Sequence, residues 1–239
     1  MINRTGILLW ALTLCLPYTV VGQVSNEELR TMRILGDLER ESRPFRSNSA
    51  NGPEVEGDSY LWKNWSPGSL TLYRENKTYE ISGLKYDVLN FGLDIYFESD
   101  KIKSLDGNLV QSFEYKDSVT QIPHRFVNGK NFTRDGAPVR GFLEVLCWGK
   151  VDVYAFTEAT LLKPNYNVAI GSGSKNYQIY KKRVLLYSTA TELRSLSRKE
   201  LETLWSERAD EMKKFQKINK LNPSRERDLM LMVDYFNTL

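Results

Sequence analysis

The chain has 239 residues, with 33 Lys and Arg against 30 Asp and Glu, which gives a formal net charge of +3. A balance this even gives no reason to expect nucleic acid or an acidic membrane as a partner. The length is sufficient to bury a substantial core, either as one large β domain or as one domain with an appendage.

Residues 1–22 have the three parts of a signal peptide. Arg4 supplies the positively charged start, and residues 7–16 form an uninterrupted apolar run. Small residues then precede a cleavage point after Gly22. We therefore expect an exported chain from which residues 1–22 are removed, and the loss of Arg4 lowers the formal charge to +2.

Two alternatives to a cleaved signal are weaker. A membrane anchor needs about 20 apolar residues, and Pro17 ends this run earlier. Lipid attachment at Cys15 needs a small residue before the cysteine, where Leu14 stands. After cleavage only Cys147 remains, so the mature chain has no internal disulfide. This cysteine content favours a bacterial envelope, with the protein in the periplasm or outside the cell. No later apolar run is long enough to span a membrane, so we expect no transmembrane segment after cleavage.

Residues 23–58 are predicted to be a helix-compatible segment followed by a mobile linker. Ser25 and Glu28 have the spacing of a helix capping box within residues 24–42. Residues 43–58 are rich in Ser, Asn, Gly and Pro, which favour turns and bury little surface.

Residues 59–188 show the alternation of an antiparallel sheet with one solvated face. Residues 84–88 and 93–97 alternate apolar and polar side chains, and turn residues separate such segments. The pattern predicts a mainly β fold: an antiparallel curved sheet, a sandwich or an open barrel. Residues 124–140 are predicted to be a long loop or a loose hairpin, and residues 163–175 an exposed loop.

Residues 189–239 change to helical spacing. Ser197 and Glu200 form a predicted capping box. Asn222 followed by Pro223 predicts the N-cap and first residue of a second helix. Because so short a helical tail is marginal in isolation, we expect it to pack on the β domain or on a partner.

Two motifs give the chain a resemblance to known sequences. Residues 141–150 read GFLEVLCWGK, and the chain ends in DYFNTL at residues 234–239. Over residues 60–239 the order of elements resembles a group of uncharacterised exported bacterial proteins with a β-rich body and a short helical tail. The resemblance implies a fold and a location, and it brings no catalytic residue.

The sequence offers few groups for catalysis or metal binding. His124 is the only histidine, and no nucleophile motif accompanies it. One histidine and one cysteine, Cys147, are too few ligands for a zinc site. The segment Asp106-Gly107-Asn108 offers too few oxygen ligands for a calcium site. We predict no catalytic residue, no metal and no cofactor.

Four carboxylates are the best candidates for an enzyme. Asp87, Asp94, Glu98 and Asp100 fall on neighbouring predicted strands, and glycoside hydrolysis requires two carboxyl groups in a cleft. The alternation, however, places Asp87 and Asp94 on the solvated face, where charged side chains are ordinary.

Aromatic residues make up 12% of the chain, and most of them fit a β core. Trp62 and Trp65 flank Asn64 just before a turn, which makes them the predicted ligand-binding pair. The leading hypothesis is a non-catalytic binding or scaffolding module whose partner is an envelope protein or an apolar ligand. The alternatives are a carrier of lipid or another apolar ligand, and a carboxylate-dependent hydrolase.

Overall fold

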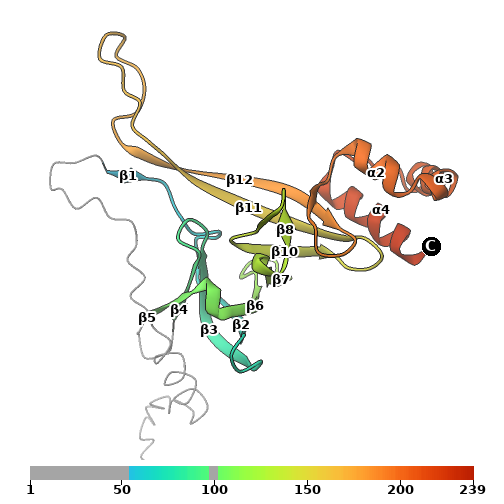
Figure 1. Ribbon diagram of the computed structural model, residues 1–239, viewed down its shortest axis with the longest axis horizontal. Coiled ribbons are helices and arrows are strands. Elements are labelled where there is room, and N and C mark those ends of the chain that lie inside the picture. Colours follow the sequence, from blue (N-terminus) through green and yellow to red (C-terminus); the bar gives the residue numbers. More distant parts are fainter. Residues whose placement is uncertain (1–53, 97–101) are drawn as a thin grey trace, which may run out of the picture.

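The computed structural model describes residues 54–96 and 102–239, and all of its strands except two belong to one large twisted sheet (Figure 1). The strand order is β1-β12-β11-β10-β7-β6-β2-β3-β4-β5, and β13 also pairs with β12. Neighbouring strands are antiparallel except β1 and β12, which are parallel. The sheet is not closed into a barrel, so the predicted mainly β fold is confirmed as a curved open sheet. The predicted signal peptide, residues 23–53 and the carboxylates Glu98 and Asp100 lie outside the described residues.

The strands and helices follow one another in a simple order along the chain. The strands of the sheet are β1 (Val55–Glu56), β2 (Ser66–Leu72), β3 (Thr78–Asp87), β4 (Gly92–Tyr96), β5 (Ile102–Asp106), β6 (Val110–Lys116), β7 (Pro123–Asn128), β10 (Phe142–Cys147), β11 (Asp152–Leu162), β12 (Tyr177–Ser188) and β13 (Arg194–Ser195). A separate hairpin contains β8 (Thr133–Arg134) and β9 (Ala137–Pro138). The helices of the tail are α2 (Arg198–Leu204), α3 (Ala209–Asn219) and α4 (Glu226–Thr238), with short 3-10 turns at Gly107–Leu109, Gly129–Asn131 and Ser206–Arg208.

Strands β2 to β7 enclose an aliphatic and aromatic core. In β3 the buried side chains of Tyr79 and Ile81 alternate with exposed Glu80, as the sequence pattern predicts. The ring of Phe113 on β6 stacks on Phe126 of β7 with their centroids 4.6 Å apart. Apolar residues from six consecutive strands therefore face the same interior.

Residues 124–140 were predicted to be a long loop or a loose hairpin, and the β8–β9 hairpin lies in this segment. The prediction was wrong for the first five residues, which belong to strand β7. Two of the three inward positions of β7 are polar, His124 and Asn128, and so the apolar alternation is hidden. The buried Asn128 amide donates hydrogen bonds to the carbonyls of Gly107 and Val110, at 2.9 and 2.7 Å. These bonds satisfy a polar group that would otherwise destabilise the interior.

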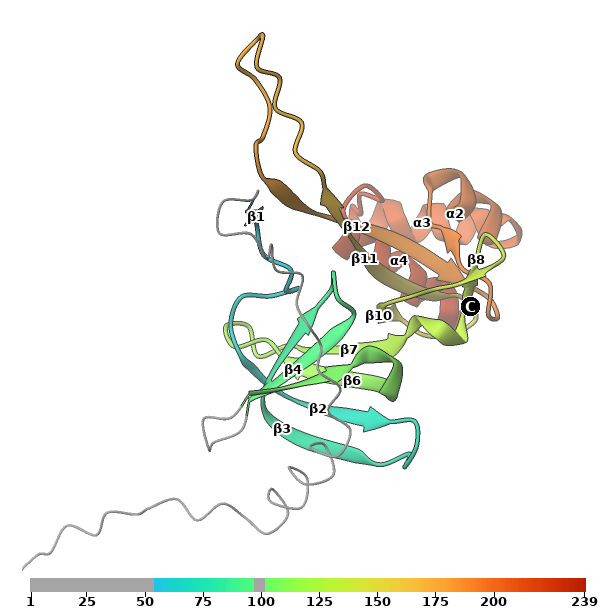
Figure 2. The same cartoon turned by 60° about the vertical axis from the view of Figure 1, so that its left-hand side comes forward.

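Strands β11 and β12 form a long hairpin that leaves the body of the protein (Figure 2). Their antiparallel register continues without a break from Asp152 opposite Ser188 to Leu162 opposite Gln178. Residues 163–176, which include the predicted loop 163–175, connect the two strands at the far end. The hairpin thus has a base inside the sheet and an exposed arm.

The helical tail packs on one face of β10, β11 and β12, at the base of this hairpin (Figure 1). The hydroxyl of Ser197 accepts the N–H of Glu200 at 3.2 Å, which confirms the predicted start of α2. The predicted helix start at Asn222 was wrong, because α4 begins at Glu226. The Asn222 side chain instead accepts the N–H of Ser224 in a local turn.

The packing of the tail predicts a sharp contrast between two adjacent residues of α4. Met232 is 2% exposed and faces the sheet, whereas Leu231 is 45% exposed. Met232→Ala should lower the free energy of unfolding by about 2–4 kcal/mol, because it leaves a cavity. Leu231→Ala should change it by less than about 1 kcal/mol. Urea unfolding of both variants checks this, and equal losses would contradict the described docking of α4.

Buried tyrosines predict that the fold is lost at alkaline pH. Burial raises the pKa of Tyr115 to about 12, and the Glu144 carboxylate adds to this effect. Burial also raises the pKa of Tyr86 and of Tyr154 well above the usual value. The native state therefore holds these protons more tightly than the unfolded chain does. The resulting stability is complete below about pH 10 and is lost as the pH rises towards about 12.

In an alkaline titration, the tyrosinate absorbance of these residues should appear together with the loss of circular dichroism. Complete tyrosine ionisation near the usual phenol pKa of about 10, with an intact circular dichroism spectrum, would contradict the burial of these rings.

Candidate functional site

A groove of about 860 Å³ lies between the helical tail and β12. Its walls come from α2, α3 and α4, from the turn that joins α3 to α4, and from the base of β12. This volume falls within the range of about 300–1,000 Å³ that small-molecule sites occupy. The groove is therefore a candidate site for a ligand.

Apolar side chains from all three helices form the floor of the groove. Leu201 and Trp205 are four residues apart, and Leu229 and Met232 are three apart, so each pair lies on one helical face. All four are buried or nearly so. The full apolar lining consists of Leu185, Leu196, Leu201, Trp205, Ala209, Met212, Pro223, Leu229 and Met232.

Charged and polar side chains form the rim. Arg198 donates a hydrogen bond to Glu202 at 3.1 Å, so this cation is already paired. Lys213 on α3 also lines the groove, and it forms no ion pair with any residue of the described chain. The rim therefore offers an available positive charge above an apolar floor.

A chain of ion pairs links the sheet to the tail beside this groove. The Arg183 guanidinium on β12 donates to the Glu144 carboxylate on β10 at 2.6 Å and to the Glu226 carboxylate at 2.8 Å. Glu226 is the first residue of α4, where a negative charge is favourable. Burial by itself would lower the pKa of Arg183, but the hydrogen bonds to Glu226 and Glu144 raise it above its usual value. Arg183 therefore remains a cation.

Glu144 is the buried centre of this chain, with a side chain only 9% exposed. Its second oxygen forms a 2.6 Å hydrogen bond with Nδ1 of His124 on β7. The His124 ring stacks in turn on Tyr115, with centroids 4.9 Å apart. The histidine, for which the sequence offered no catalytic partner, thus belongs to a polar network that crosses the sheet.

The predicted ligand-binding pair is not brought together. Trp62 stacks on Tyr115 at 3.8 Å, and its indole N–H donates to the Leu84 carbonyl. Trp65 instead lies against Tyr96, with ring centroids 5.8 Å apart. Both rings are partly buried and pack against the β2–β6 half of the sheet, away from the groove.

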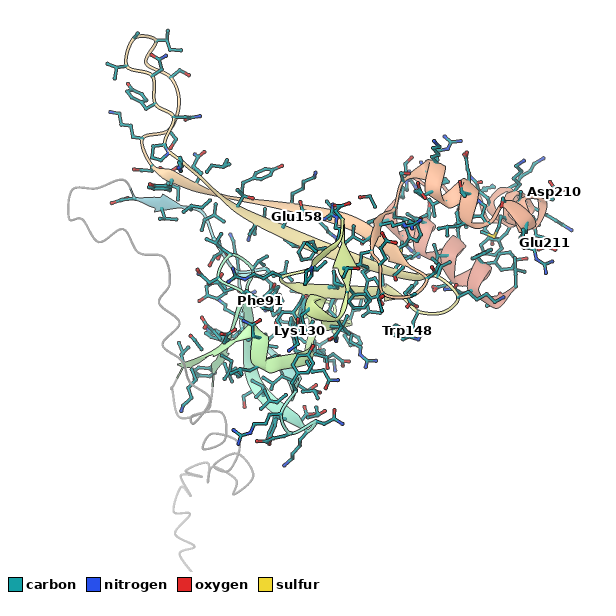
Figure 3. All side chains as sticks on the ribbon, viewed as in Figure 1. Phe91, Lys130, Trp148, Glu158, Asp210 and Glu211 are labelled. Carbon is teal, nitrogen blue, oxygen red and sulfur yellow. The ribbon has the colours of Figure 1, made fainter. Side chains whose placement is uncertain are left out.

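Another tryptophan is far more exposed. Trp148 is 71% exposed and lies at the turn between β10 and β11, as Figure 3 shows. It follows the strand in which Glu144 lies, but it does not line the groove. The exposure of Trp148 could not be predicted from the sequence, because a tryptophan in a short turn can be either exposed or packed.

The predicted exposure of Asp87 was wrong, because this residue is only 9% exposed. Its carboxylate accepts the backbone N–H and the side-chain amide of Asn90, at 3.0 and 2.7 Å, and so holds the β3–β4 turn. Asp94 accepts the hydroxyl groups of Tyr60 and Ser104. Both carboxylates are thus occupied by local hydrogen bonds.

Cys147 is buried beside α4. Burial raises the pKa of its thiol, and the nearby Asp234 carboxylate raises it further. The side chain remains a protonated thiol, which is a poor nucleophile. Within residues 54–96 and 102–239, no cluster of three or more His, Cys, Asp or Glu side chains is placed to hold a metal ion.

Sequence reasoning missed the residues that build this site. Glu144 stands inside the apolar run 142–147, and a charge at such a position was an available signal for a buried network. Arg183 gave no signal, because it is the last of three consecutive cations, a composition typical of an exposed segment. The apolar floor was recognised only as the buried face of helices.

Comparisons with known proteins add no assignment. No protein-family model, curated protein or solved structure matches the chain. None of the described helices has the length and apolar composition needed to cross a membrane.

Proposed function

We propose that this protein is an exported, non-catalytic binding protein that holds an amphipathic ligand in the groove under its helical tail. The ligand would have an apolar chain and an anionic head group. The observation that carries this proposal is the apolar floor together with Lys213 on the rim. Export is supported by the signal-like pattern of residues 1–22.

The free energy of binding is favourable for an extended apolar chain in the groove. Each buried methylene contributes about 0.8 kcal/mol, so a chain of about twelve contributes roughly 10 kcal/mol. Association costs at least about 4 kcal/mol. An ion pair between the head group and Lys213 adds up to about 1 kcal/mol at an exposed rim. The balance corresponds to a dissociation constant in the micromolar range.

The described residues support binding rather than catalysis. His124 is held by Glu144, and Asp87 and Asp94 are held by turn and hydroxyl contacts. None of these three residues lines the groove. A hydrolase would need a reactive pair facing a cleft, and this pair of carboxylates supports no such activity.

Charge reversal on the rim tests the head group. Dodecanoate should bind the full chain with micromolar affinity, and the cationic analogue dodecyltrimethylammonium should bind more weakly. Lys213→Glu should weaken dodecanoate binding by about five- to tenfold and should favour the cationic analogue. The matched control, Lys214→Glu, changes a neighbour that does not line the groove and should leave both affinities unchanged. Isothermal titration calorimetry measures all six combinations of chain and ligand.

Filling the groove tests the location. Ala209 is the first residue of α3 and lines the groove. Ala209→Phe should abolish dodecanoate binding. The control, Ser206→Phe, adds the same ring at an exposed position that does not line the groove, and it should leave the binding unchanged. Unchanged binding by Ala209→Phe, or no binding of either ligand by the original chain, would contradict the proposal.

A further inference from the structure

The arm made by β11 and β12 ends in a tip that stands clear of every other described segment. The two ribbon views agree on this, and Figure 3 shows side chains projecting from the arm on all sides. Regular strand pairing ends at Leu162 and Gln178, and residues 163–176 continue outward from there. Nothing in the packing of the body requires this extension.

The tip presents aliphatic side chains to solvent. Val168 is 84% exposed and Ile170 is 73% exposed, and both lie in the turn at residues 168–171. Tyr166, just below the turn, is 38% exposed. Aliphatic side chains at the most distant point of a projecting arm gain no stability from the fold. Their position is therefore better explained by contact with something outside the chain.

The backbone below the turn is held in a defined shape. Asn165 and Asn167 each exchange backbone or side-chain hydrogen bonds with the opposite strand of the loop, at Ser174 and Ser172. The Asn167 side chain also accepts the N–H of Ala169 at 3.0 Å. The N–H groups of Asn165, Asn167, Ala169, Ser172 and Ser174 are thus satisfied within the loop, which lowers part of the penalty for entering an apolar phase.

Beyond Glu158, the charge of the arm has one sign. Between Ala159 and Thr191 the sequence contains five Lys and Arg and no Asp or Glu. Lys163 and Lys175 flank the tip, and the Lys175 ammonium lies 4.6 Å from the centre of the Tyr166 ring.

Further down the arm the other cations are partly occupied. Lys181 donates to the Tyr60 carbonyl, and Arg183 belongs to the ion-pair chain. At the outer end of the strands, Glu56 of β1 accepts the side-chain amides of Asn176 and Gln178, so its carboxylate is occupied. Lys163 and Lys175 thus leave positive charge at the tip, although the charge of the whole chain is nearly balanced.

We propose that the tip of this arm inserts shallowly into the surface of an anionic phospholipid bilayer. Val168 and Ile170 would enter the boundary between head groups and acyl chains, while Lys163 and Lys175 contact lipid phosphates. Tyr166 lies between these levels, as amphipathic aromatic rings do at membrane interfaces. The site is separate from the groove, and the inference does not rest on the proposed ligand.

A bilayer fits this tip better than a protein does. A stable protein interface buries about 800 Å² on each partner, far more than a four-residue turn can offer. A bilayer needs only a few aliphatic side chains and nearby cations. Each aliphatic side chain changes partitioning by about tenfold or more when buried, and each lysine by about fivefold at an anionic surface. The resulting attachment is weak and reversible.

Vesicle flotation of the full chain tests the inference. The chain should float with phosphatidylcholine vesicles that contain about a third phosphatidylglycerol, and much less with pure phosphatidylcholine. The double variant Val168→Ser with Ile170→Ser should reduce the partition coefficient at least about tenfold. The control is Val119→Ser with Ile122→Ser, at 83% and 56% exposure in the β6–β7 turn, and should match the unsubstituted chain.

Two further variants separate the parts of the mechanism. Lys163→Gln with Lys175→Gln should lower binding to the anionic vesicles by about tenfold or more and leave the weak binding to phosphatidylcholine unchanged. Ile170→Trp places a fluorescent probe at the tip, and its emission relative to the unsubstituted chain should shift to shorter wavelength on the anionic vesicles. This signal reports the tip itself, whatever other segments of the chain contact.

Flotation that persists at full strength in the Val168→Ser, Ile170→Ser variant would overturn the proposal. So would an Ile170→Trp emission that does not change with anionic vesicles. If no vesicle binds at low salt, the arm contacts something other than phospholipid, and the proposal is wrong.

Discussion

The ion pairs that Arg183 makes with Glu144 on β10 and with Glu226 at the start of α4 join the sheet to the helical tail. Glu144 is nearly buried, and a buried carboxylate is destabilising unless donors surround it. His124 and Arg183 supply those donors from two different strands. Apolar contacts between the tail and the sheet provide most of the stabilisation, whereas the ion pairs fix where α4 begins. The shape of the groove follows from that position.

The same network connects the two halves of the fold. Trp62 stacks on Tyr115, Tyr115 stacks on His124, and the histidine meets Glu144. This row extends from the core enclosed by β2 to β7 to the face that carries the helices. The described sheet is therefore not two independent layers joined by a linker. A substitution of Glu144, at the centre of this row, affects the tail directly, because Arg183 pairs both with Glu144 and with Glu226 at the start of α4.

Local patterns were sufficient to predict most of the fold. Alternation in residues 84–86 and helical spacing after Ser197 depend on neighbouring residues, and both predictions were confirmed. The failures involved residues whose role is set by distant partners or by turns. Asp87 is buried because it holds a turn, and Asn128 is buried because it bonds carbonyls some twenty residues earlier. The groove depends on how α4 packs against β12, and the local spacing of apolar residues along the chain does not predict this contact.

The ion pairs that join Glu144 through Arg183 to Glu226 set the position of α4, and hydrogen exchange tests this claim directly. Glu144→Gln removes the charge while keeping the side-chain shape, and it should weaken the link by about 1 kcal/mol or more, since Arg183 is 40% exposed. The amides of α4 should then exchange about fivefold faster or more, while those of β2 to β4 keep their rates. Unchanged exchange in α4, or an equal increase throughout the sheet, would contradict the account.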